Sequence, residues 1–171
     1  HVDLGHLVRA NADAGIDLER GATMKVTRDL LIRQDVEWAS TYFATGVWGT
    51  DATVSSGQWD LVNSTPIEDI RSNYYTIASG TGQLANTLVL GANTYKRLQD
   101  HPDILDRIKY TQTAIVTPGL IGSIVDVGRV EVLFGVRNTA ADGAATGTYG
   151  FNAGNHALLV YAAEARRPTE E

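Results

Sequence analysis

The segment 86-NTLVLGANTYKRLQDHPDILDRIKY-110 decides the fold that we predict for this chain. Its first part, Thr87 to Leu90, is a short apolar run rich in strand-forming residues, which predicts a buried strand. Gly91 ends that run, and Asn93 or Thr94 can cap a short helix directly after it. The first half of the segment therefore predicts a strand, a tight turn and a helix.

The second half of the segment contains a helix break at His101-Pro102. Proline has no backbone N–H, and the residue before it is biased away from the helical conformation. A second short helix is expected from Asp103, with Ile104 and Ile108 four residues apart on one face. The segment has no paired nucleophile and base, no phosphate-binding glycine loop and no cluster of metal ligands. The residues alone therefore indicate a rigid packing unit.

The order and spacing of these motifs resemble the major capsid (head) proteins of tailed bacteriophages. In that family a strand ending in glycine is followed by a short helix and by a His-Pro-Asp or His-Pro-Glu segment that continues to Asp-Arg-Ile-Lys-Tyr. The resemblance covers most of residues 20 to 162. Its other parts are Trp59 and 66-PIEDI-70 upstream, and 132-VLFG-135, 138-NTA-140 and 158-LLVY-161 downstream.

The resemblance implies an α+β capsid fold with a long spine helix, a peripheral domain and an axial domain around the capsomer centre. Helices and strands that alternate along the chain also predict the α+β class. The implied division is a remnant of an amino-terminal arm or extended loop in 1–22, a peripheral part with the spine helix in 23–63, the axial domain in 64–155, and a return strand of the peripheral domain with a tail in 156–171. Proteins of this family have further sequence on both sides of the matched region, so the chain is expected to be a fragment or a processed chain.

Composition narrows the classes of function. The chain has 171 residues, of which 43% are hydrophobic and 20% charged, as in ordinary globular domains. Its net charge of −6 disfavours direct binding to nucleic acid, which needs Lys and Arg to neutralise phosphates. The absence of cysteine excludes disulfides and thiolate zinc sites. The sequence shows neither an apolar run that would span a membrane nor a signal-peptide pattern.

Residues 23–45 carry the strongest helix signal. Thr23 can cap this helix, and no proline or glycine interrupts it before Gly46. Its apolar residues form two neighbouring stripes, one of Met24, Leu31 and Trp38 and one of Ile32, Val36 and Phe43. Such stripes predict a core helix, with Trp38 buried against the sheet, and the resemblance identifies this helix with the capsid spine.

Six further elements complete the predicted order. Pro66 in a first turn predicts a helix whose apolar residues are spaced to share one face and which ends by Gly82. The helical face holds Ile67, Ile70, Tyr74 and Ile77. The other elements are a short strand near 58–61, a helix from Thr117-Pro118 through Val125, a strand over 129–134, a mobile loop over 138–151 and a buried strand over 157–161.

Catalytic and metal-binding motifs are absent from the sequence. G-x-S-x-G, the P-loop and H-E-x-x-H do not occur, and the four histidines show no zinc-binding spacing. His101 could act as a general base, and Asp103 with Asp106 could pair as acid and base. A histidine that packs at a helix break and carboxylates at a helix start are the favoured interpretations. We predict no catalytic, cofactor-binding or metal-binding residue.

The resemblance predicts a structural subunit of a bacteriophage or prophage icosahedral capsid that self-assembles around packaged double-stranded DNA. Expected partners are copies of the chain, as hexamers and pentamers of the full-length protein, together with scaffold, portal or decoration proteins. DNA would be enclosed without specific recognition, no membrane would take part, and the virion capsid would be assembled in the cytoplasm of the bacterial host. The alternatives are an encapsulin-type nanocompartment shell protein, or a soluble enzyme or ligand-binding domain that uses His101, Asp103 and Asp106.

Overall fold

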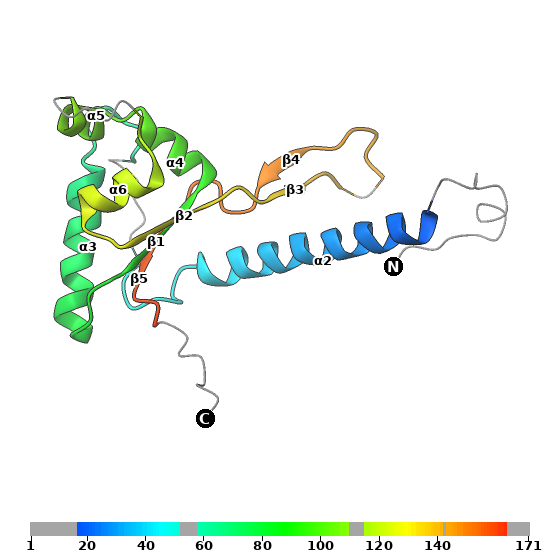
Figure 1. Cartoon of the computed structure of the whole chain (residues 1–171), viewed down its shortest axis with the longest axis horizontal. Coiled ribbons are helices and arrows are strands. Elements are labelled where there is room, and N and C mark those ends of the chain that lie inside the picture. The colour runs from blue at the N-terminus through cyan, green and yellow to red at the C-terminus, as the bar shows by residue number, and fades with distance from the viewer. Residues whose placement is uncertain (1–16, 52–57, 110–114, 142, 164–171) are drawn as a thin grey trace.

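The computed structural model describes residues 17–51, 58–109, 115–141 and 143–163. A body of sheet and short helices holds one end of a long helix, α2 (Leu18–Tyr42), which extends away from it. A two-stranded hairpin extends from the body in the same direction (Figure 1). The predicted mixture of helices and sheet is confirmed.

The central sheet has three strands in the order β2-β1-β5. β1 (Thr87–Gly91) lies in the middle, parallel to β2 (Arg129–Leu133) and antiparallel to β5 (Ala157–Val160). Leu88 pairs with both Val130 and Leu159 across the sheet. A strand with neighbours on both sides typically has a continuous apolar sequence. Four of the five β1 residues are buried, as predicted. β5 is an edge strand whose residues are exposed or half-buried, so the prediction of a buried final strand is wrong.

Four short helices cover the sheet. They are α3 (Pro66–Thr81), α4 (Ala92–Gln99), α5 (Pro102–Ile108) and α6 (Pro118–Val125), and three of them begin with proline at the first helical position. The helices predicted from Pro66 and from Thr117-Pro118 are confirmed, as is the break at His101-Pro102. The core is formed by Ile67, Ile70, Tyr74, Ala85, Leu88, Leu90, Leu98, Ile104, Ile108, Val116, Ile121, Val125 and Val127.

The turn before β5 is fastened to the start of α4. The Gly154 carbonyl accepts hydrogen bonds from the Asn93 N–H (3.0 Å) and the Thr94 N–H (3.2 Å). These are N–H groups of the first helical turn, which have no partner inside the helix. The predicted side-chain cap by Asn93 or Thr94 is wrong, because Gly91 occupies the cap position and a carbonyl from a distant turn satisfies the donors.

The long helix differs from its prediction in two ways. It begins at Leu18, because the Asp17 carboxylate accepts a hydrogen bond from the Arg20 N–H at 2.9 Å. Residues 18–22 therefore belong to the helix, whereas residues 1–16 lie outside the described part. Ala39 is the one fully buried residue of α2, and Trp38 is half-buried. The prediction that Trp38 is buried against the sheet is wrong.

Two local predictions also need correction. Residues 58–61 form a turn, closed by a hydrogen bond from the Leu61 N–H to the Gln58 carbonyl, so the predicted strand is wrong there. The predicted loop over 138–151 is wrong at its two ends, where residue 138 belongs to β3 (Val136–Asn138) and residues 149–151 form β4 (Tyr149–Phe151), which pair antiparallel. Each strand has only three residues, too few for an alternating pattern that the sequence could show.

Candidate functional site

The candidate general base His101 is buried at the junction of α4 and α5, where 3% of its surface is exposed. Its Nδ1 accepts a hydrogen bond from the Asp103 N–H at 3.2 Å, which caps α5. Its Nε2 lies 3.1 Å from the Leu61 carbonyl oxygen and 3.0 Å from the Ser64 Oγ. The imidazole therefore joins the helix break to the turn that precedes α3.

These contacts decide which ring nitrogen carries the proton. A neutral imidazole has one donor and one acceptor, and Nδ1 is the acceptor here, so Nε2 carries hydrogen. The Ser64 hydroxyl donates to the Leu61 carbonyl at 2.7 Å. A serine nucleophile would need a bare Nε2 to receive its proton, and this arrangement presents the opposite polarity. The geometry of His101 is that of a helix cap and cross-link.

Asp103 holds the start of α3 instead of pairing with Asp106. Its Oδ2 accepts a 3.4 Å hydrogen bond from the Ile67 N–H, one of the donors at the α3 N-terminus that need outside partners. The Thr65 side chain makes no such cap. Asp106 is exposed and shares no hydrogen bond or ion pair with His101 or Asp103. Asp103 is thus engaged by the start of α3 and by Arg107 and not by Asp106.

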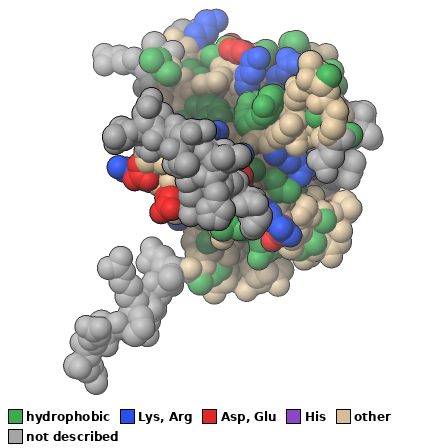
Figure 2. Space-filling view, turned by 90° about the vertical axis from the view of Figure 1, so that its right-hand side faces the viewer, with side chains coloured by type: hydrophobic (Ala, Val, Ile, Leu, Met, Phe, Trp, Pro, Cys, Tyr) green, Lys and Arg blue, Asp and Glu red, His purple; other side chains and the backbone are tan. Residues whose placement is uncertain are grey.

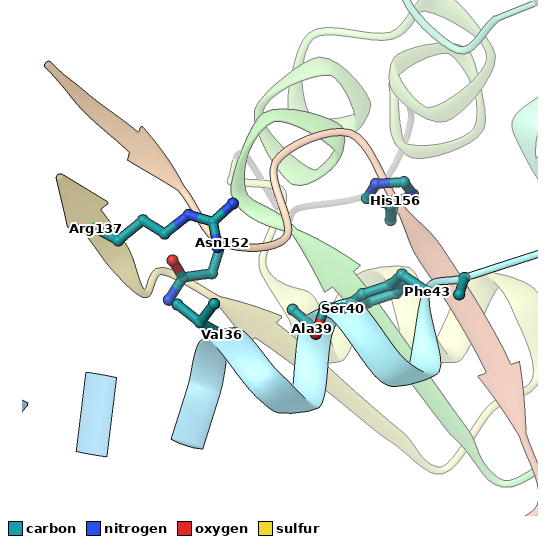
Figure 3. A pocket seen from close by; sticks show the side chains of 8 residues that line it. Val36, Ala39, Ser40, Phe43, Arg137, Asn152 and His156 are labelled. Carbon is teal, nitrogen blue, oxygen red and sulfur yellow. The ribbon is translucent and has the colours of Figure 1, made fainter. Parts of the chain in front are cut away.

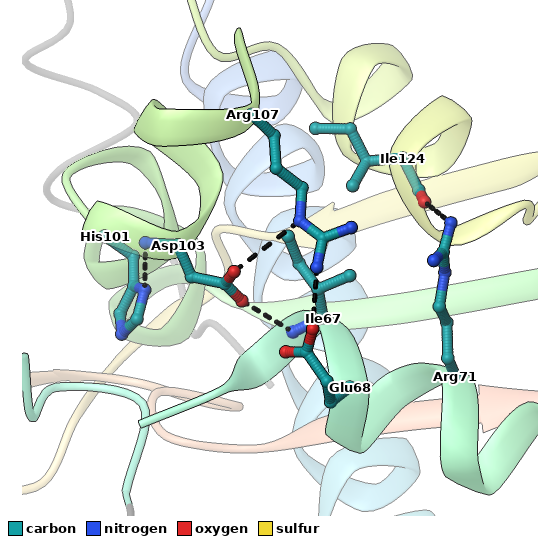
Figure 4. A network of polar contacts seen from close by, with 7 residues as sticks. All are labelled: Ile67, Glu68, Arg71, His101, Asp103, Arg107 and Ile124. Atoms are coloured by element: carbon teal, nitrogen blue, oxygen red, sulfur yellow. Dashed lines mark hydrogen bonds and ion pairs between the residues drawn. The ribbon is translucent and has the colours of Figure 1, made fainter. Parts of the chain in front are cut away.

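Two arginines complete this polar network (Figure 4). Arg107 lies 2.6 Å from the Glu68 Oε1 and 3.6 Å from the Asp103 Oδ1. Arg71 donates to the Ile124 carbonyl at the end of α6, at 2.9 Å. The network ties α3, α5 and α6 together through the ends of the helices, where backbone groups lack partners. Its chemistry is that of a structural clamp.

The sequence pointed to His101, Asp103 and Asp106 but not to Ser64, Leu61 or Arg71. The partners of His101 lie about 40 residues earlier, in a stretch without periodic apolar residues. Only the arrangement of α3 against α5 brings them together. Among the described residues, no three His, Asp or Glu side chains converge as a metal site would require.

A cavity of about 170 Å³ lies between α2 and the hairpin. Arg137 and Asn152 approach it from the hairpin side, and Val36, Ala39 and Phe43 from the helix (Figure 3). The His156 ring stacks on Phe43, with centroids 5.1 Å apart. The residues that line this cavity show which side of α2 and which side of the hairpin face each other.

Apolar side chains, most of them exposed, lie on other sides of these two elements. On α2, we call Met24, Leu31, Trp38 and Tyr42 the α2 stripe. They recur at helical spacing, and Met24 and Leu31 are 59% and 58% exposed. On the hairpin, Val136, Tyr149 and Phe151 point away from α2, because side chains alternate along a strand and Arg137 and Asn152 point toward it.

With Phe134, which follows β2, these three residues form what we call the hairpin face. Tyr149 is 73% exposed and Phe134 61%. Figure 2 looks at the molecule from the side toward which α2 and the hairpin extend. Its visible described side chains are basic, acidic and hydrophobic groups interspersed, without a surface of one charge. No helix within the described ranges combines the length and apolarity needed to cross a membrane.

Comparison with solved structures identifies a similar fold. The fold matches the crystal structure of a phage-related protein from Bordetella bronchiseptica RB50, with a TM-score of 0.77 and 23% identity over 93% of this chain and 52% of that one. This likeness shows the fold alone. No family model matches the sequence.

A match by sequence indicates a class of protein as well as a fold. The chain is 26% identical over 129 residues to the major capsid protein of Burkholderia phage BcepMu. The match includes 72% of this chain and 41% of the relative, so the chain spans less than half of that protein's length. The resemblance to phage major capsid proteins that was predicted from the sequence is thereby confirmed.

Proposed function

We propose that this chain is a structural subunit of a bacteriophage or prophage icosahedral capsid and assembles with copies of itself. The observation that carries the proposal is the similarity to a phage major capsid protein over 72% of the chain. The exposed α2 stripe and hairpin face support it, because apolar patches of this kind are typical of surfaces that are covered in an assembly.

In this proposal α2 is the spine of the peripheral domain, and the body from α3 to β4 is the axial domain, with β5 returning to the peripheral domain. The His101, Asp103 and Arg107 network keeps the short helices in fixed positions. A shell subunit needs such rigidity, since many small contacts repeated by symmetry must form with one geometry. The role is structural and does not involve turnover.

The shell would enclose double-stranded DNA without recognising its sequence. An acidic chain of net charge −6 limits adhesion to the packaged DNA and so suits this role. Hexamers and pentamers of the full-length protein, together with scaffold, portal or decoration proteins, are the expected partners. The capsid would be assembled in the host cytoplasm and then form part of the virion.

Electron microscopy of the complete gene product, expressed alone, tests the proposal. Closed particles of uniform size are expected. A gene product that stays monomeric at high concentration, or that turns over a substrate in a manner abolished by replacing His101, would overturn it. Particles that carry a specific protein cargo and never nuclease-resistant DNA would instead favour the encapsulin-type alternative.

A further inference from the structure

Few contacts hold the direction in which α2 leaves the body. Ala39 is its one fully buried residue, and the stacking of Phe43 on His156 lies at its C-terminal end. The side-chain hydrogen bonds of Arg33 and Ser40 stay within the helix. α2 and the hairpin extend from the body in the same direction, and the cavity of about 170 Å³ lies between them (Figure 1). The direction of α2 therefore depends on the residues around this cavity.

The Asn152 amide lines the cavity with its hydrogen-bonding capacity unmet. Its Nδ2 and Oδ1 are both shielded from solvent, and neither has a hydrogen-bond partner among the described residues. Buried polar groups of native proteins are nearly always paired, because an unpaired group loses its hydration without compensation. An amide donates hydrogen at its nitrogen and accepts hydrogen at its oxygen. Asn152 therefore needs an acceptor at one end and a donor at the other.

A carboxylate of α2 lies near the nitrogen end of this amide. A Cβ added at Gly135 would be 2.8 Å from the Asn152 Nδ2 and 3.3 Å from the Asp35 Oδ2, so both atoms lie around the same glycine Cα. Asp35 is exposed. Residues three and four positions away share its side of the helix, and none of them is basic. They are Leu31, Ile32, Trp38 and Ala39. A cation that neutralises Asp35 must therefore come from outside α2.

Arg137 is a cation on the facing side of the hairpin. It pairs with Gly150, two residues before Asn152, and side chains two apart in a strand point to the same side. Arg137 and Asn152 are thus diagonal neighbours, a separation that a long side chain can span. In the view of Figure 3 the amide oxygen lies on the side of Arg137 and the amide nitrogen on the side of α2. The ion pairs between described residues involve neither Arg137 nor Asp35.

We propose that Asp35, Asn152 and Arg137 form a latch that fixes the direction of α2 relative to the hairpin. Arg137 donates a guanidinium N–H to the Asn152 Oδ1, and the Asn152 Nδ2 donates to the Asp35 carboxylate. The opposite charges polarise the amide in the same sense, which strengthens both hydrogen bonds. Asp35 and Arg137 are exposed, so their side chains can rotate toward the amide. The latch lies within one chain, so it goes beyond the proposed function and does not depend on it.

Distance measurement between two spin labels tests the latch in the intact chain, which has no cysteine of its own. Labels at Lys25→Cys on α2 and Ser72→Cys on α3, both exposed, report the direction of α2 relative to the body. A single narrow distance distribution is expected. Asp35→Ala, Arg137→Met and Asn152→Ala should each broaden it to the same extent, because each removes one part of the latch.

Glu37→Ala is the matched control. Glu37 is an exposed acid of the same helix, but it pairs with Arg33 within α2 at 3.1 Å. Its removal should leave the distance distribution unchanged. A broad distribution in the parent chain, or equal widths in the parent and in Asn152→Ala, would overturn the latch. Broadening by Glu37→Ala as great as that by Asp35→Ala would show that Asp35 has no specific role.

Exchange of the two charges gives the sharper test. Asp35→Arg alone and Arg137→Asp alone each place like charges at the two ends of the amide and should broaden the distribution. The double variant should restore the narrow distribution, because an amide can turn end over end and present its oxygen to residue 35 and its nitrogen to residue 137. Broad distributions in all three proteins, with parent-like circular dichroism, would refute a link through Asn152.

Discussion

Gly91 lies against the carbonyl oxygen of Ala153 so closely that a Cβ added at residue 91 would be 1.5 Å from that oxygen. The backbone of Gly91 is in an ordinary extended conformation, with φ −71° and ψ 154°. Glycine is therefore required here because a Cβ would not fit, and not because of the backbone conformation. The contact lets the turn before β5 cap α4 and brings the end of the chain back beside β1.

Replacing Gly91 with alanine should disrupt this packing. The obstacle is backbone of a turn that is itself held by hydrogen bonds, so no flexible side chain can move aside. We expect Gly91→Ala to lower the free energy of unfolding by more than about 3 kcal/mol. Urea denaturation followed by circular dichroism measures this change.

Gly80 is the matched control, since it lies within α3 with open space around the position of a Cβ. Gly80→Ala should raise stability by about 0.5–1 kcal/mol, because alanine restricts the unfolded chain and favours helix. Equal effects of the two substitutions would show that the turn does not pack on Gly91 as described.

His101 should contribute to stability through both ring nitrogens. His101→Ala removes the cap of α5 and the link to Leu61, and we expect a loss of about 2–3 kcal/mol. His101→Asn should lose less, because asparagine is a good helix cap even though it cannot reach Leu61. Thermal melts of the three proteins test the order. Identical melting temperatures would remove His101 from the structural network.

Asn86 fixes the end of β5 by a paired contact with residue 162. Its Nδ2 donates to the Ala162 carbonyl and its Oδ1 accepts from the Ala162 N–H, both at 2.8 Å. Asn86→Ala should cost about 1–3 kcal/mol, because it removes two hydrogen bonds.

Asn86→Asp keeps the acceptor for the Ala162 N–H but places a carboxylate oxygen against the Ala162 carbonyl, so it should be no more stable than Asn86→Ala. Hydrogen exchange at Ala162 should accelerate in both variants. Unchanged protection at Ala162 in both variants would mean that the contact is not formed in solution.

Trp38 is predicted to matter more for assembly than for folding. It is half-buried and packs on Tyr42 and Phe43, with ring centroids 5.1 Å and 5.6 Å away. We expect Trp38→Ala to cost about 2 kcal/mol in the single chain, less than the roughly 3–5 kcal/mol of a fully buried tryptophan. Chemical denaturation gives the first value, and particle yield of the complete gene product gives the effect on assembly. A loss of 4 kcal/mol or more in the single chain would show that Trp38 is fully buried, as the sequence predicted.

The sequence determined the elements whose signals are local. The apolar run Thr87–Leu90 predicted a strand, and the proline positions predicted where α3, α5 and α6 begin. Strand propensity and the missing proline N–H act within a few residues, so they can be read without knowing the fold. The same holds for the resemblance to phage capsid proteins, which rests on the order of such motifs along the chain.

Only the tertiary structure decided what those elements bury and which residues they bring together. The heptad spacing of Met24, Leu31 and Trp38 predicted a core face, yet the chain folds with Met24 and Leu31 exposed. The spacing of apolar residues shows that one face of a helix is apolar. Whether the rest of the chain covers that face depends on where distant elements pack. Likewise Gly91 and His101 owe their roles to Ala153 and Leu61, which lie far away in sequence, because van der Waals contact and hydrogen bonding depend on distance in space.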